Sequence, residues 1–157
     1  MRKRTIRKVW AKIDPIANAI AGASITPASE RDRLLLRELS ALDDFTKGRA
    51  TIQQWSDLSM VLNLCETVAK EKIGAEALPA CKTAEAALIE AAMRFEQTGR
   101  MGLSGPGITA MREVIEYHDA QRASISRSQY ERLIKLCIAR VKGGHQTTNV
   151  CEAFAKC

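Results

Sequence analysis

Apolar residues recur every three or four positions along most of this chain, which is the spacing of an amphipathic helix. The most regular stretch runs from residue 51 to residue 69. Its apolar residues form a wide face: Trp55, Leu58, Leu62, Cys65 and Ala69, with Val61, Leu64 and Val68 beside them. A helix this apolar is expected at the centre of the fold. No segment alternates apolar and polar residues for long enough to predict a sheet.

The helices of the first half are predicted to begin at side chains that can accept a backbone hydrogen bond, at Asp14-Pro15, Thr26-Pro27 and Thr51. The first is expected to continue through Ala21. The second has Glu30 near its first turn and ends at Gly48. Its buried face is predicted to contain Leu35, Leu39, Leu42 and Phe45.

The second half continues the helical pattern. A helix is expected after Gly74 and ends at Gly99. Its small residues are expected to let a neighbouring helix approach closely. The buried side is predicted to contain Ala84, Leu88, Ala91 and Phe95, with Ala80, Ala87 and Ala92 nearby. Residues 101–107 contain three glycines and a proline and are interpreted as a flexible linker and candidate hinge. A further face follows, made of Ile108, Met111, Ile115 and His118.

A last helix is predicted from the capping-box pattern of Ser128 and Glu131. It ends at Gly143 and Gly144, and its inward residues are Tyr130, Ile134, Cys137 and Val141. The expected fold is therefore an all-α, single-domain bundle of five or six helices. Residues 1–13 are expected to form a basic amphipathic helix or arm, residues 14–143 the helical domain, and residues 144–157 a loosely ordered tail or short docked helix.

Charge is distributed very unevenly. The formal net charge of the chain is +6, and the six cations of the first twelve residues would supply all of it. Residues 13–120 carry 11 basic and 16 acidic residues, whereas residues 121–157 carry 7 basic and 2 acidic residues. Such clusters of cations attract phosphates and acidic surfaces.

Two basic clusters are the candidate sites for nucleic acid or another partner. The first is Arg2, Lys3, Arg4, Arg7, Lys8 and Lys12; the second is Arg122, Arg127, Arg132, Lys135, Arg140 and Lys142. The first cluster could instead dock on the acidic part of its own chain, and the second could be a solvated helix face. The segment before the last helix lacks the small-residue turn of a helix-turn-helix, so phosphate contacts are expected to outweigh base readout.

Catalytic and metal-binding patterns are weak. His118 lies beside Asp119, but neighbouring residues on a helix point about 100° apart, and no nucleophile accompanies them. A half-buried, hydrogen-bonded structural histidine is the favoured interpretation. His145, Cys151 and Cys157 lack the short ligand pair of a zinc site, and residues 102–107 lack the lysine of a phosphate-binding loop. No enzyme activity, metal or cofactor is predicted.

The sequence also bears on location. No apolar run approaches the ~20 residues of a membrane-spanning helix, and the basic N-terminus lacks the apolar segment of a signal peptide. The five cysteines form no Cys-x-x-Cys pair, which fits a reducing compartment, and Cys65 and Cys137 fall on apolar stripes. A cytoplasmic protein is expected.

Four segments of the chain are distinctive: residues 1–10 (MRKRTIRKVW), 13–17 (IDPIA), 117–122 (YHDAQR) and 124–127 (SISR). In these segments the chain resembles a group of short proteins encoded by phages and prophages of proteobacteria. The similarity extends to about Val141. It implies a setting in an infected bacterial cell and supplies no catalytic residue.

Together these observations predict a non-enzymatic phage accessory protein that associates with nucleic acid, or with a complex that processes it, through its basic ends. The alternative is a phage-encoded inhibitor that binds a host protein complex, of the anti-CRISPR type. In that case the acidic part of the chain could mimic phosphate, or the basic end could hold an acidic host surface.

Overall fold

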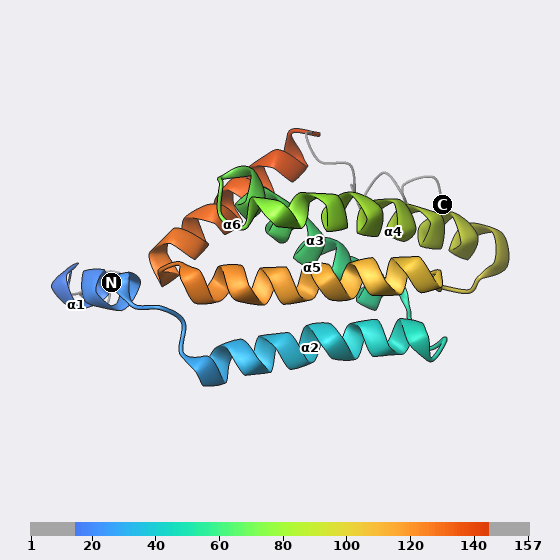
Figure 1. The fold of residues 1–157 in the computed structure, drawn as a ribbon, viewed down its shortest axis with the longest axis horizontal. Coiled ribbons are helices and arrows are strands. Elements are labelled where there is room, and N and C mark those ends of the chain that lie inside the picture. Colours follow the sequence, from blue (N-terminus) through green and yellow to red (C-terminus); the bar gives the residue numbers. More distant parts are fainter. Residues whose placement is uncertain (1–14, 145–157) are drawn as a thin grey trace, which may run out of the picture.

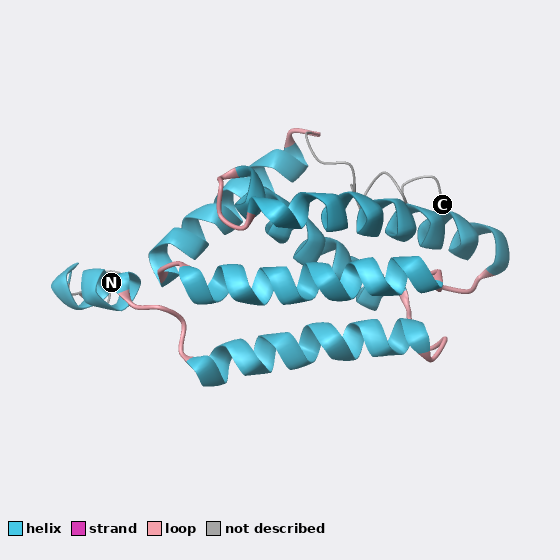
Figure 2. Cartoon of the chain, viewed as in Figure 1, coloured by secondary structure: helices cyan, strands magenta, loops and turns pink. Residues whose placement is uncertain are grey.

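The computed structural model describes residues 15–144, which form six α-helices and one short 3-10 helix (Figures 1 and 2). The elements are α1 (Pro15–Ala23), α2 (Ala28–Thr46), α3 (Ile52–Lys70), η1 (Ala75–Ala77), α4 (Leu78–Thr98), α5 (Gly105–Ser124) and α6 (Arg127–Lys142). Within this part of the chain the only β-type pairing is an isolated bridge between Ile25 and Ser126. The expected all-α bundle is confirmed. None of the helices between residues 15 and 144 combines the length and apolarity needed to cross a bilayer.

Helix α3 is the central element, as its apolar face predicts. It packs against α2, α4, α5 and α6. Trp55 and Leu58 are buried, and the indole nitrogen of Trp55 donates a hydrogen bond of 2.8 Å to the carbonyl oxygen of Leu88 on α4. Because a buried indole N–H without a partner is costly, this bond also fixes how α3 and α4 are placed relative to each other.

The helices α4 and α5 form an antiparallel pair, and α2 lies on the other side of α5 (Figure 1). The alanines expected to permit close packing on α4 are buried, including Ala84, Ala87 and Ala91. Opposite them on α5 stands Gly107, where an added Cβ would lie 2.6 Å from the Cβ of Ala87. This glycine is therefore required by the close approach of the two helices rather than by chain flexibility.

The linker and hinge predicted for residues 101–107 is wrong for residues 105–107, whereas residues 101–104 do connect α4 to α5. Ser104 caps α5 by accepting a 3.2 Å hydrogen bond from the backbone of Gly107, so residues 105–107 form the first helical turn. Met101 is buried, and Arg94 donates to the carbonyl oxygen of Gly102. The Ser-Gly-Pro-Gly sequence is a helix start, because proline suits the first turn and serine suits the cap.

The other predicted helix starts are close to those observed. Thr51 forms the expected cap, in a capping box with Gln54, and α1 begins at Pro15. Helix α2 begins one residue later than predicted, with Pro27 in the cap position and no side-chain cap. The capping box of α6 is formed by Ser126 and Gln129, not by Ser128 and Glu131. Ser126 has the extended backbone that a cap requires, and Ser128 already lies inside the helix.

Candidate functional site

A buried polar network joins α5, α6 and α3 on one side of the bundle. His118 is 1% exposed, and its Nε2 lies 3.0 Å from the hydroxyl of Tyr130 while its Nδ1 lies 3.4 Å from Oε1 of Gln121. The amide nitrogen of Gln121 donates to the carbonyl oxygens of Cys65 and Ile73. The network therefore ties the start of α6 and the end of α5 to α3 and the turn that follows it.

These bonds determine the protons of His118. Since the Gln121 nitrogen donates to two carbonyl oxygens, Oε1 must face the imidazole and act as an acceptor. Nδ1 then carries the proton, and the unprotonated Nε2 accepts the hydroxyl proton of Tyr130. Burial lowers the pKa of His118 to about 3, with the nearby Arg122 charge adding to this effect, so the ring is neutral at pH 7.

Both ring nitrogens of His118 are thus used within the chain. Burial also raises the pKa of the Tyr130 phenol to about 12, so its hydroxyl keeps its proton. A neutral, hydrogen-bonded histidine of this kind agrees with the structural interpretation of His118, although burial is more complete than the half-buried position that the sequence suggested.

Arg122 and Glu38 form a buried ion pair beside this network. The two guanidinium nitrogens of Arg122 donate bidentately to the Glu38 carboxylate at 2.6 and 2.9 Å, and the Arg122 side chain is 2% exposed. Burial raises the pKa of Glu38, although Arg122 acts in the opposite direction. For Arg122, burial alone would lower the pKa, but the hydrogen bonds and charge of Glu38 raise it. Arg122 therefore joins α5 to α2. Its predicted place in the second basic cluster, as a residue that binds nucleic acid or another partner, is wrong because its side chain is buried.

A cavity of about 290 Å³ lies over these groups, between α2, α3, α5 and α6. Its apolar lining includes Leu58, Val61, Leu64 and Ile134, and its polar lining includes His118, Arg122 and Tyr130. Leu34 and Met60 also line it, together with the ion-forming residues Arg37, Glu38 and Asp57. The cavity thus combines an apolar wall with polar groups that already bond to one another.

The remaining five cations of the second basic cluster all lie on α6, where two form ion pairs and three do not. Arg127 pairs with Glu30 and Glu131, and Arg140 is half-buried and donates to Glu71 at 3.1 Å. By contrast, Arg132, Lys135 and Lys142 are exposed and make no ion pair with the residues that the structure describes. At 100° per residue these three lie within an arc of about 80°, and we call them the α6 basic face.

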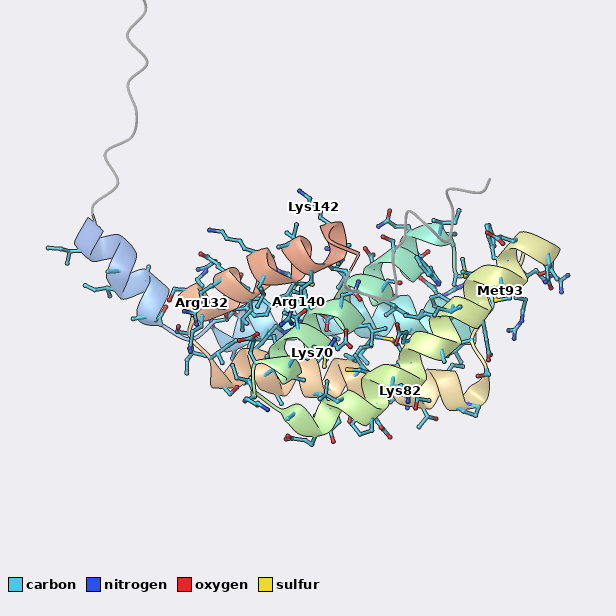
Figure 3. The ribbon with its side chains drawn as sticks, turned by 90° about the horizontal axis from the view of Figure 1, so that it is seen from above. Lys70, Lys82, Met93, Arg132, Arg140 and Lys142 are labelled. Atoms are coloured by element: carbon cyan, nitrogen blue, oxygen red, sulfur yellow. The ribbon has the colours of Figure 1, made fainter. Side chains whose placement is uncertain are left out.

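Figure 3 shows this arrangement from above: Arg132, Arg140 and Lys142 follow one another along α6, and the side chain of Lys142 extends away from the bundle. Three of the six cations predicted for the second cluster are therefore exposed and have no ion-pair partner within residues 15–144. The first cluster, Arg2, Lys3, Arg4, Arg7, Lys8 and Lys12, lies outside the described residues, as do His145, Cys151 and Cys157.

No group of three or more His, Cys, Asp or Glu side chains within residues 15–144 is arranged to hold a metal ion. Cys65, Cys81 and Cys137 are buried and reduced. A hydrogen bond to Cys81 and burial both raise the pKa of the Cys65 thiol, which keeps it protonated. Cys65 and Cys137 occupy core positions, as their places on apolar stripes predicted.

The sequence analysis predicted that Tyr130 points inward, but it missed Glu38 and Gln121 as members of the buried network. Glu38 and Gln121 gave one usable signal, because each is a polar residue at a position that continues an apolar helical stripe. Their pairing could not be foreseen, since Glu38 and Arg122 are 84 residues apart in the sequence.

Comparison of the chain with protein-family models, with curated proteins and with solved structures gives no match.

Proposed function

We propose that this protein is a non-enzymatic phage accessory protein that associates with nucleic acid, or with a complex that processes it, through the α6 basic face and the basic N-terminal residues. It would act in the cytoplasm of the bacterial host. The observation that carries the proposal is the set of three exposed cations on α6, Arg132, Lys135 and Lys142, which have no ion-pair partner among the described residues.

The contrast with the rest of the bundle supports this choice of surface. Helix α6 carries five basic residues and one acidic residue, whereas residues 13–120 carry 11 basic and 16 acidic residues. A phosphate backbone would therefore be attracted to α6 and repelled by much of the remaining surface. Other cations near α6 form ion pairs with acidic residues of other elements: Arg140 pairs with Glu71, and Arg122 pairs with Glu38.

The expected mode of binding is contact with phosphates rather than base readout. The α6 basic face contains no aromatic side chain on which a base could stack and no amide side chain that could read a base edge. Affinity should therefore depend weakly on sequence and fall steeply with salt.

The test is a fluorescence-anisotropy titration of duplex and single-stranded DNA with the full chain and two charge-matched variants. In the first variant, Arg132, Lys135 and Lys142 are changed to Glu. In the second, the exposed residues Arg33, Arg100 and Arg112 are changed to Glu. These residues make no ion pair within the described residues and lie outside α6. Both variants reach the same net charge, so only position differs.

We expect the α6 variant to bind at least about tenfold more weakly than the control variant. Equal losses in the two variants would mean that net charge alone drives binding and that α6 is not the site. Circular dichroism of both variants checks that the helices remain folded.

The second candidate function is the phage-encoded inhibitor of a host protein complex. The observation that favours it is an exposed apolar pair one turn apart on α4, Ile89 and Met93, since exposed apolar pairs often mark protein contacts. Figure 3 shows Met93 near the end of α4, far from the α6 basic face. Absence of DNA binding at physiological salt, with loss of host inhibition in an Ile89→Glu/Met93→Glu variant, would favour this function over the first.

A further inference from the structure

The cavity of about 290 Å³ between α2, α3, α5 and α6 has no part in the proposed binding of nucleic acid. Its volume lies at the small end of the range for ligand pockets. Leu58, Val61 and Leu64 of α3 form a buried apolar wall, and Ile134 adds an apolar side chain from α6. Because burial of apolar surface supplies much of the affinity in such pockets, this wall favours a ligand with an apolar body.

The charged side chains that line the cavity are balanced and already paired. Arg122 forms the bidentate ion pair with Glu38, and Arg37 lies 3.5 Å from Asp57. These residues contribute two positive and two negative charges, and the other lining residues are uncharged at pH 7. A charged ligand would lose its hydration here without meeting an unpaired charge of opposite sign. The lining therefore favours an uncharged molecule.

One donor of the lining side chains has no partner. The Nε atom of Arg122 is buried and makes no hydrogen bond with any group of residues 15–144, whereas both terminal nitrogens of the same side chain donate to Glu38. A guanidinium has no acceptor atom, so only an acceptor on another group can satisfy this N–H. Since an unpaired buried donor is costly, a ligand that offers an acceptor oxygen at this point binds better than the same molecule without it.

We propose that this cavity binds a small uncharged molecule whose apolar body packs against Leu58, Val61 and Leu64 and whose carbonyl oxygen accepts a hydrogen bond from Nε of Arg122. The ion pair with Glu38 remains in place in the bound state, because it uses the other two nitrogens of the guanidinium. The proposal is independent of nucleic-acid binding, since none of these residues belongs to the α6 basic face.

The test is a fluorescence titration of the full chain with prodan, an uncharged aminonaphthalene that carries a ketone and whose emission moves to shorter wavelength in apolar surroundings. We expect saturable binding of one prodan molecule per chain. Ile134→Trp enlarges a half-buried side chain of the cavity lining and should weaken binding by about tenfold or more. The matched control is Leu136→Trp, a half-buried position of the same helix outside the lining, which should bind as the wild type does.

A second probe isolates the hydrogen bond to Arg122. Dimethylaminonaphthalene has the ring system of prodan but no ketone, so the ratio of the two affinities measures what the ketone-bearing group contributes. The same ratio is measured in Glu38→Leu/Arg122→Met, which removes the donor together with its ion-pair partner. We expect the ratio to be about tenfold larger in the wild type than in this double variant, because only the wild type donates a hydrogen bond to the ketone.

Three results overturn the proposal. The first is no saturable binding of prodan by the wild type, or binding that Ile134→Trp leaves unchanged. The second is an equal affinity ratio in the wild type and the double variant. The third is loss of binding in Ile89→Glu/Met93→Glu, because this exposed apolar pair lies outside the cavity and the probe would then sit on the surface. Circular dichroism checks that each variant is folded, and if Ile134→Trp is not, the affinity ratio decides.

Discussion

At the scale of single residues, the buried groups of α5 hold the bundle together through bonds whose direction is determined. Gln121 orients His118, His118 accepts from Tyr130, and Arg122 pairs with Glu38. Each of these side chains is a donor or acceptor that has left water, so removing one partner leaves the other unsatisfied in the interior. The network therefore gives sharp predictions for stability.

The first prediction concerns pH. The pKa of His118 is about 3 in the folded chain and near 6.5 when unfolded. Below pH 6.5 the unfolded chain binds a proton that the folded chain does not, so this residue's contribution to stability is complete above pH 6.5 and is lost as the pH falls toward 3. The loss should be on the order of 1.4 kcal/mol for each pH unit.

The measurement is urea unfolding of the wild type and of His118→Gln between pH 7 and pH 4, and the difference between the two proteins isolates this residue. Parallel curves for the two proteins across this range would show that His118 titrates normally and is not buried as described.

The second prediction concerns the ion pair. Arg122→Met leaves the Glu38 carboxylate buried without its partner and should lower the free energy of unfolding by about 3 to 5 kcal/mol. The matched control is Arg37→Met on the same side of the bundle, where the guanidinium is 71% exposed and lies 3.5 Å from Asp57; its cost should be below about 1 kcal/mol. Glu38→Leu combined with Arg122→Met should recover most of the loss. A single variant as stable as the Arg37 control would refute the buried pair.

At the scale of helices, apolar periodicity predicted the positions and buried faces of the helices well. Cap residues predicted the first residue of each helix less accurately. The faces of α3 and α4 were predicted almost residue by residue, since a buried face must repeat with the helical turn. The starts of α5 and α6 were misplaced because Gly-Pro-Gly is compatible with both a linker and a capped first turn. Two serines near the start of α6 were also both plausible caps.

The third prediction tests the close approach of α4 and α5. Gly107→Ala places a methyl group 2.6 Å from the Cβ of Ala87 and should destabilise the protein by about 1 to 3 kcal/mol. Gly105→Ala, two residues earlier in the same helical turn, meets no atom within 4 Å and should be neutral or slightly stabilising. Thermal unfolding distinguishes the two variants.

A suppressor strengthens this test. Ala87→Gly removes the opposing methyl group and should restore much of the stability lost in Gly107→Ala. If both alanine variants unfold like the wild type, residues 105–107 are a loose linker after all.

At the scale of the whole molecule, the class of fold followed from the sequence and the candidate site followed only in part. Helical periodicity and the lack of strand alternation were sufficient for the bundle. Total charge along the chain identified α6 as basic but could not separate Arg132, Lys135 and Lys142, which face solvent, from Arg122, which is buried against a distant glutamate. Local sequence does not encode which cation meets an acid from another helix.

The central claim is that nucleic acid binds through the α6 basic face, and the most direct measurement is the salt dependence of DNA affinity. The slope of log K against log salt should be about 3 units shallower for Arg132→Glu/Lys135→Glu/Lys142→Glu than for the wild type, because up to three phosphate contacts are lost. The control variant at Arg33, Arg100 and Arg112 should keep the wild-type slope. Identical slopes for all three proteins, or no DNA binding by the wild type at low salt, would contradict the account.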